Sequence, residues 1–379
     1  MARLTPTFQL VLLATLMASG CTPKAQQGAR ESAAGNVAIK VSEIATNLDH
    51  PWGLAVLPDG SMLVTERPGR LRLVRDGKLL PQPVGGVPQV HDDGQGGLFD
   101  VALHPDFATN RLVYLSFAKG TKAANHTAVV RGVLDGTNLT NLEPVFDAVP
   151  ERSTDAHFGG RLLFLPDKTL IVTLGDGYVY RDKAQDLSSD LGKIVRITDT
   201  GGTPPDNPFV GQAGKRGEIF TFGHRNVQGI ARDPVSGRLY AHEHGPKGGD
   251  EINVLQAGRN YGWPVITYGV DYSGAPISLK NKQDGMEQPL TYWVPSIAPS
   301  GMVFYTGDLF AGWKGDLIVT ALAGQHVRHV DLNNGAVVAQ TSYLADREER
   351  YRQIVQAPDG ALLVLTDDAE GKILRLTPQ

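Results

Sequence analysis

The chain has 379 residues, of which 41% are hydrophobic and 20% are charged, so it can bury a large core. Its formal net charge of -4 excludes a general nucleic-acid-binding surface, which must be basic to hold phosphates. The 44 glycines and 24 prolines show no collagen-like period, and they favour a chain with many tight turns between short strands.

The N-terminus has the features of an export signal. Arg3 gives it a positive start, an apolar run follows over residues 8–17, and small residues precede Cys21. The apolar run is too short to cross a bilayer as a mature helix. A cysteine directly after Ser-Gly resembles a bacterial lipobox, in which that cysteine becomes the lipidated first residue of the mature protein. An ordinary signal peptide with an incidental cysteine is the alternative.

We therefore expect residues 1–20 to form a signal peptide of the lipoprotein type. Residues 21–36 are rich in Ala, Gly, Gln and Ser and predict a flexible tether, and residues 37–379 form the folded domain. The protein is expected in the periplasm, with membrane contact only through a lipid on Cys21 in the outer membrane. Cys21 is the only cysteine, which excludes disulfides and thiolate metal sites in the domain.

One pattern recurs six times in this domain: a turn containing Pro-Asp or similar residues leads into a short apolar strand. The turns lie at residues 57–60, 104–106, 165–167, 233–234, 312–316 and 357–360. Proline presets φ, Asp and Gly accept tight turn geometry, and β-forming residues follow. Helical periodicity is almost absent. The pattern predicts an all-β fold, a six-bladed β-propeller of four-stranded antiparallel sheets closed into a ring.

The spacing of the six copies is uneven. It is longest between Asp233 and Trp313, so that this part of the chain must contain large loops, which are often functional. A closed ring brings the ends of its innermost strands together near one axis. We therefore expect a site assembled from segments that are far apart in the sequence.

Several of these segments combine glycine, charge and histidine. His157 precedes two glycines, and its imidazole is the natural acceptor of a proton from a hydroxyl near neutral pH; Asp176 could orient the ring. Arg225, Arg350 and Arg352 could clamp carboxylates through forked hydrogen bonds.

Oxygen ligands for Ca²⁺ are also available. Asp250, Glu251 and Asp271, with the carbonyls of Gly245 and Pro246, provide the oxygen-rich set that Ca²⁺ needs.

Each feature also has a purely structural interpretation. A histidine beside glycines can be an ordinary loop residue, arginines can pair between blades, and an Asp-Glu pair can be a polar turn. His242 and His244 alternate as on a strand, but no third zinc ligand of fitting spacing is evident. The glycines around Gln95 do not form a phosphate-binding loop, because no Lys-Ser/Thr follows. The residues alone predict a propeller with a polar central site.

In combination, the segments resemble the soluble PQQ-dependent glucose/sorbosone dehydrogenase family, and more closely its aldose sugar dehydrogenase branch. The resemblance runs from residue 50 to residue 375. It is carried by the segments 50–54, 94–98, 102–105, 157–162, 223–226, 250–253, 260–264 and 350–352. It implies a six-bladed propeller that contains pyrroloquinoline quinone (PQQ) and Ca²⁺.

The resemblance also implies roles for individual residues. His157 corresponds to the base that takes the proton of the sugar's anomeric hydroxyl while hydride passes to the quinone, and Asp176 to the carboxylate that supports it. The positions that face the cofactor are then Gln95, Arg225, Asn226, Tyr272, Ala323, Arg350 and Arg352. Gly245 and Pro246 would bind the cofactor-associated Ca²⁺ through their carbonyls, and Glu251, Tyr261 (by its carbonyl) and Asp271 a structural Ca²⁺.

One position departs from the family pattern. Family members with a Leu-Lys pair before the C-terminal blade use the lysine against the quinone, whereas here Leu322 is followed by Ala323. One cation is thereby lost from the cofactor site.

The expected activity is the oxidation of an aldose to the aldonolactone, with electrons passing to an external acceptor, a quinone or a redox protein. Two alternatives are a calcium-dependent sugar lactonase on a six-bladed propeller and a non-catalytic propeller lipoprotein. The lactonase has no need for three cofactor-facing arginines, and the pairing of His157 with Asp176 argues against a non-catalytic protein.

Overall fold

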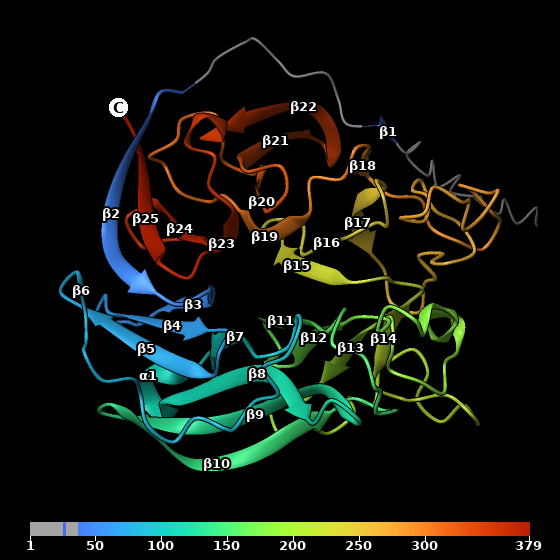
Figure 1. Cartoon of the computed structure of the whole chain (residues 1–379), viewed down its shortest axis with the longest axis horizontal. Coiled ribbons are helices and arrows are strands. Elements are labelled where there is room, and N and C mark those ends of the chain that lie inside the picture. Colours follow the sequence, from blue (N-terminus) through green and yellow to red (C-terminus); the bar gives the residue numbers. More distant parts are fainter. Residues whose placement is uncertain (1–25, 28–36) are drawn as a thin grey trace, which may run out of the picture.

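The computed structural model describes residues 26–27 and 37–379, and most of its regular structure is strand. Six antiparallel four-stranded sheets stand in a ring (Figure 1), which confirms the predicted six-bladed β-propeller. The predicted signal peptide, Cys21 and most of the tether lie outside the described residues. None of the helices in the described part is long and apolar enough to cross a membrane.

The blades follow one another along the chain. Blade 1 contains β3 (Pro51–Val56), β4 (Met62–Glu66), β5 (Arg70–Arg75) and β6 (Lys78–Leu79); blade 2 contains β7 (Leu98–Leu103), β8 (Leu112–Gly120), β9 (Asn125–Asp135) and β10 (Asn138–Asp147); blade 3 contains β11 (Gly159–Phe164), β12 (Leu170–Leu174), β13 (Lys193–Ile197) and β14 (Ile219–Phe222). Blade 4 contains β15 (Val227–Arg232), β16 (Leu239–Glu243), β17 (Asp250–Leu255) and β18 (Thr291–Trp293); blade 5 contains β19 (Pro299–Phe304), β20 (Leu317–Ala321), β21 (Val327–Asn333) and β22 (Ala336–Tyr343). Blade 6 contains β23 (Tyr351–Gln356), β24 (Leu362–Thr366), β25 (Gly371–Pro378) and β2 (Ile39–Leu48). Short helices are α1 (Phe107–Asn110), η1 (Arg181–Gln185) and η2 (Ala345–Arg347).

Blade 6 joins the two ends of the folded domain. Its outermost strand, β2, comes from the N-terminal side and pairs antiparallel with β25, the last strand of the chain (Figure 1). This pairing closes the ring without a covalent link and leaves no gap between the first and last blades. At the edge of blade 4, β1 (Gln26–Gln27) pairs in parallel with β18.

The six recurring turns all have the same place in a blade: each joins the innermost strand to the second strand. In four blades the turn aspartate, Asp59, Asp167, Asp233 or Asp359, accepts a hydrogen bond from the backbone N–H two residues further on, at 3.0, 3.0, 2.9 and 3.2 Å. This local bond stabilises the turn before any blade packs on another. The repeat visible in the sequence is therefore the scaffold of the propeller.

Every innermost strand has a register irregularity near its start. The shifts lie at Pro51/Leu54, Leu98/Val101, Gly159/Leu162, Val227/Gly229, Pro299/Gly301 and Tyr351/Gln353. A β-bulge bends a strand and redirects its side chains, and bulges are frequent next to binding sites. Six of them at the same edge of the ring indicate where the site lies.

The guanidinium of Arg161, on β11, connects all six blades at the centre. It donates hydrogen bonds to backbone carbonyls in four other blades: to Trp52 at 3.4 Å, Gln228 at 2.7 Å, Ser300 at 2.5 Å and Arg352 at 3.0 Å. In the remaining blade it faces the carboxylate of Asp100 at 3.6 Å.

Both charged groups are buried, and burial moves their pKa values in opposite directions. Burial lowers the pKa of Arg161 to about 10, although Asp100 opposes this, so the guanidinium stays charged at neutral pH. Burial raises the pKa of Asp100, and Arg161 opposes that rise. The charge of each group therefore helps to keep the other one ionised in the buried centre.

Replacing Arg161 with Met should destabilise the protein by about 3–5 kcal/mol, because it leaves Asp100 as an uncompensated buried charge. The free energy of unfolding in urea measures this. The control is Arg75→Met, an exposed arginine on β5, which should change stability by less than about 0.5 kcal/mol. A loss below about 1 kcal/mol for Arg161→Met would show that the central arginine does not hold the ring.

Candidate active site

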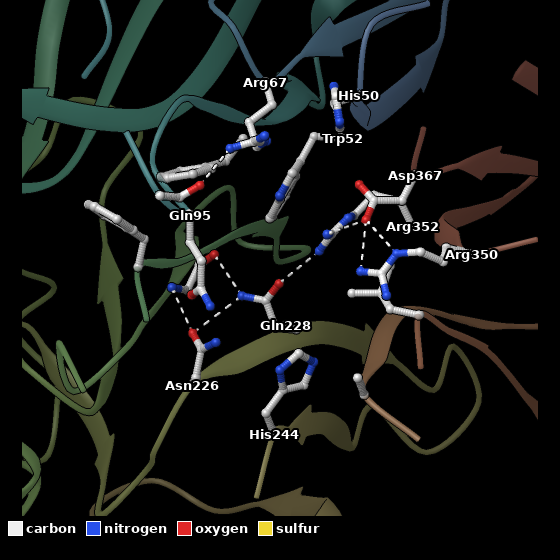
Figure 2. A pocket seen from close by; sticks show the side chains of 16 residues that line it. His50, Trp52, Arg67, Gln95, Asn226, Gln228, His244, Arg350, Arg352 and Asp367 are labelled. Carbon is white, nitrogen blue, oxygen red and sulfur yellow. Dashed lines mark hydrogen bonds and ion pairs between the residues drawn. The ribbon is translucent and has the colours of Figure 1, made fainter. Parts of the chain in front are cut away.

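A cavity of about 460 Å³ opens at the edge of the ring where the innermost strands begin (Figure 2). Its walls come from the starts of these strands and from the residues that follow β4, β16, β20 and β24. The lining residues are His50, Trp52, Arg67, Gly94, Gln95, Phe99, Phe158, Gly159, Asn226, Gln228, His244, Ala298, Leu322, Arg350, Arg352 and Asp367. The cavity therefore lies on the opposite face from the six recurring turns.

His157 and Asp176, predicted to act together, are in contact. The Nδ1 atom of His157 lies 2.7 Å from the carboxylate of Asp176, and both side chains are buried. Asp176 also accepts hydrogen bonds from the indole N–H of Trp263 and the backbone N–H of Tyr178, each at 2.7 Å. A carboxylate bound at Nδ1 favours the tautomer with its proton there, so Nε2 is left as the proton acceptor.

The backbone at His157 is unusual, with a positive φ of 57°. Two neighbours hold it in place. Gln95 accepts a hydrogen bond from the N–H of His157 at 2.8 Å, and the carbonyl of His157 lies so close to Gly175 that a Cβ there would come within 2.0 Å of it. The strained conformation of His157 thus depends on a glycine eighteen positions away in the chain.

The surroundings of His157 favour its neutral form. Burial lowers the pKa of the imidazole below its ordinary value of 6.5, the charge of Asp176 raises it, and Arg225 and Arg152 lower it. The net shift is downward. A neutral imidazole at physiological pH is the form that can accept a proton.

Arg350 and Arg352, both predicted to face the cofactor, line the cavity together and share a carboxylate. The Nη2 atoms of both lie 3.1 Å from Oδ2 of Asp367 (Figure 2). Although burial alone would raise it, Arg352 and Arg350 hold the pKa of Asp367 below its usual value. Asp367 was not among the predicted site residues; the signal that could have found it is its place directly after the strand of the sixth repeat.

The cavity has one aromatic wall. Trp52, Phe99 and Phe158 come from three blades, with ring centroids 5.4 Å apart between Trp52 and Phe99 and between Phe99 and Phe158. The predicted cofactor residues Gln95 and Asn226 also line the cavity, and Asn226 accepts a hydrogen bond from the N–H of Gly159 at 3.1 Å.

Arg225 and Tyr272 lie elsewhere. Both line a second cavity of about 310 Å³, with Pro246, Asp271 and Trp263. Arg225 is buried and donates from Nη1 to the carbonyl of Gly245 at 2.7 Å, whereas the side chain of Tyr272 is exposed. Ala323 is exposed in the connection after β20, beside Leu322, which lines the main cavity.

The predicted metal ligands are divided between two places. Glu251, Tyr261 and Gly245 line a small cavity of about 10 Å³, whereas Pro246 and Asp271 line the second cavity. Asp271 accepts hydrogen bonds from the N–H and the hydroxyl of Ser273, at 2.9 and 2.8 Å.

A further carboxylate, which the sequence analysis did not select, lines the small cavity. Glu243, at the end of β16, borders it together with Glu251. Burial and the charge of Glu243 raise the pKa of Glu251 well above its usual value. Within residues 37–379, no three His, Cys, Asp or Glu side chains form a metal-binding group.

Comparison with known proteins decides the family. The profile described as Glucose / Sorbosone dehydrogenase matches residues 48–375. The chain belongs to this family. It is therefore an oxidoreductase, as the resemblance predicted. The aldose sugar dehydrogenase YliI of Escherichia coli (strain K12) is 45% identical over 347 residues, which are 90% of this chain and 93% of that protein.

Solved structures of the family agree with this assignment. A soluble aldose sugar dehydrogenase from Escherichia coli in its apo form is 44% identical, with a TM-score of 0.87, and covers 90% of this chain and 100% of its own. The PQQ-bound form of an aldose sugar dehydrogenase from Streptomyces coelicolor is 31% identical, with a TM-score of 0.76, and covers 90% of this chain and 98% of its own.

We expect the imidazole of His157 to titrate below pH 6.5 in the apoprotein, because burial outweighs the charge of Asp176. Asp176→Asn removes the charge that raises this pKa, so the midpoint should move to still lower pH. The ¹⁵N shifts of labelled histidine, assigned by comparison with His157→Gln, measure both values. A midpoint above 6.5, or an upward shift in Asp176→Asn, contradicts the assignment of His157 as a neutral base.

Proposed function

We propose that this protein is a PQQ-dependent aldose dehydrogenase that oxidises the anomeric hydroxyl of a sugar to the aldonolactone and passes the electrons to an external acceptor. The observation that carries the proposal is the buried His157–Asp176 pair beside a cavity with arginines and an aromatic wall. The PQQ-bound relative from Streptomyces coelicolor supports the cofactor.

His157 acts as the general base in this proposal. Its Nε2 accepts the proton of the anomeric hydroxyl, and the carboxylate of Asp176 stabilises the imidazolium that forms. The hydrogen bonds from Trp263 and from the N–H of Tyr178 keep that carboxylate in place throughout. The pair is buried, so little solvent reorganisation accompanies the proton transfer.

The main cavity suits an anionic, planar cofactor. Arg350 and Arg352 can bind carboxylates, Gln95 and Asn226 can bind polar ring substituents, and Trp52 can pack against a flat ring. When it is bound, PQQ supplies the two-electron acceptor for the oxidation. Arg225 would reach the quinone from the side of the second cavity, next to Tyr272.

Two calcium ions complete the proposal. The carbonyls of Gly245 and Pro246 would hold one beside the cofactor, where it would draw electron density from the acceptor carbonyl. Because Arg225 donates a hydrogen bond to the carbonyl of Gly245, that carbonyl would have to exchange this bond for the metal or share its second lone pair with it.

The second ion would lie at Glu251. The small cavity there can hold about one water-sized group. Burial and the charge of Glu243 raise the pKa of Glu251, and a divalent cation bound between the two carboxylates would offset both charges. Glu243 and the carbonyl of Tyr261 would complete the ligand set, and Asp271 would join it after a movement of its loop.

We further propose that the protein is exported to the periplasm and held at the outer membrane by a lipid on Cys21. The support is the sequence pattern of residues 1–21. Mass spectrometry of the mature N-terminus tests this.

Reconstitution tests the proposed function. We expect apoprotein mixed with PQQ and Ca²⁺ to reduce an artificial dye when an aldose is added. His157→Gln should lower kcat by about 10²-fold or more, with unchanged PQQ affinity, because the base is lost and the cofactor cavity is kept.

The matched control is His329→Gln on β21, a buried histidine that lies 2.7 Å from the carboxylate of Asp316 and does not line the cavity; it should keep the wild-type kcat. Hydrolysis of an aldonolactone without dye reduction would favour a calcium-dependent lactonase. Full turnover in His157→Gln with bound PQQ would remove His157 as the base.

Calcium should raise the Tm of the apoprotein, because it binds the folded state. At a calcium concentration of 100 times the Kd, the free energy of unfolding should rise by about 2.7 kcal/mol. Since protons compete with calcium at Glu251, the gain should increase with pH across the raised pKa of this residue. Glu251→Gln should abolish most of the gain, and the exposed Glu151→Gln should not. Equal gains in both variants would place the ion elsewhere.

A further inference from the structure

Arg67 lines the main cavity but was not among the predicted site residues. It follows β4 in blade 1 and approaches the cavity from the side of Gly94 and Gln95, away from Arg350 and Arg352 (Figure 2). Three blade-1 residues, His50, Trp52 and Arg67, thus form one side of the cavity.

The charge of the cavity depends strongly on Arg67. The charged groups on its walls, apart from histidines, are three arginines and the carboxylate of Asp367. Asp367 binds both Arg350 and Arg352 and so offsets one of their charges. The ion pair that Arg67 makes is with Asp92, whose carboxylate lies 4.0 Å away and is 40% exposed, a longer contact than the 3.1 Å contacts of Arg350 and Arg352 with Asp367. Arg67 is therefore the arginine of the cavity whose charge is least compensated by the protein.

The position of Arg67 is fixed by its neighbours on both sides. Its N–H donates to the carbonyl of His50 at 3.1 Å, and its carbonyl accepts from the N–H of Leu98 at 2.8 Å. Its Nη1 atom donates to the carbonyl of Gly94 at 2.7 Å.

Gly97 shows how closely this segment packs. With φ of 128°, a Cβ at Gly97 would come within 2.1 Å of the carbonyl oxygen of Arg67. A side chain there would push Arg67 out of place. The glycines of the segment 94–97 therefore do more than form a turn: they let Arg67 lie against the loop that contains Gln95.

We propose that Arg67 is a cofactor-binding residue that supplies positive charge from blade 1, on the side of the cavity away from Arg350 and Arg352. This inference rests on the proposed binding of PQQ. A forked guanidinium facing the cavity can bind a carboxylate or a quinone oxygen, and among the arginines that line this cavity only Arg67 does not share the carboxylate of Asp367.

The test is PQQ affinity of the full-length apoprotein in calcium buffer, followed by quenching of tryptophan fluorescence. Arg67→Gln keeps an amide donor but loses the charge, whereas Arg67→Lys keeps the charge. We expect the Kd to rise about 10- to 100-fold in Arg67→Gln and much less in Arg67→Lys, with the melting temperature of both apoproteins unchanged. The control is Arg75→Gln, on the same blade at the far edge, which should bind as the wild type does.

The double variant Arg67→Gln/Ala323→Lys separates charge from loop structure. Recovery of affinity in the double variant means that a cation from blade 5 replaces the one lost from blade 1, whatever happens to the 94–97 loop. A wild-type Kd in Arg67→Gln, or equal weakening in Arg67→Gln and Arg67→Lys without recovery in the double variant, overturns the inference. A different result would contradict the proposed function itself: no binding of PQQ by the wild type, although the wild type and Arg75→Gln unfold alike and are therefore both folded.

Discussion

The buried guanidinium of Arg161 is the interaction on which the rest of the structure depends. It ties blade 3 to the carbonyls of blades 1, 4, 5 and 6 and to Asp100 of blade 2. Three of these contacts are made by residues that also line the cavity: Trp52, Gln228 and Arg352. The bond network that holds the ring together therefore also sets the floor of the cavity, and a shift of any blade would move the residues that line it.

The site above this floor is organised in advance of ligand binding. Asp176 has three hydrogen-bond donors, and Arg350 and Arg352 are held by one carboxylate. Because these contacts already restrict the side chains, a ligand that binds there has less conformational entropy to pay for. The small cavity at Glu251 is different, because burial and the charge of Glu243 raise the pKa of Glu251 well above its usual value. The carboxylate in the main cavity is thus paired with arginines, whereas Glu251 lies beside a second carboxylate.

Much of the fold was predictable because its signals are local. Four of the six Pro-Asp-type turns contain a local bond from the aspartate to their own backbone, and a β-forming strand follows each turn, so the number of blades could be counted. The pairing of β2 with β25 could not be predicted, since the two strands lie at opposite ends of the chain and no local pattern relates them. The contacts of Arg161 are equally non-local.

For the site, the sequence determined which residue types were available, and the family resemblance assigned their roles. His157 contacts Asp176, and Arg350 and Arg352 share the carboxylate of Asp367, while the roles of these residues stay predictions. Only the tertiary structure revealed Asp367, Glu243 and Arg67 and separated Asp271 from Glu251. The physical reason is that the repeating turns lie on the far face, whereas the cavity is built from irregular connections between strands. Those connections follow no period, and their side chains meet only after the ring has closed.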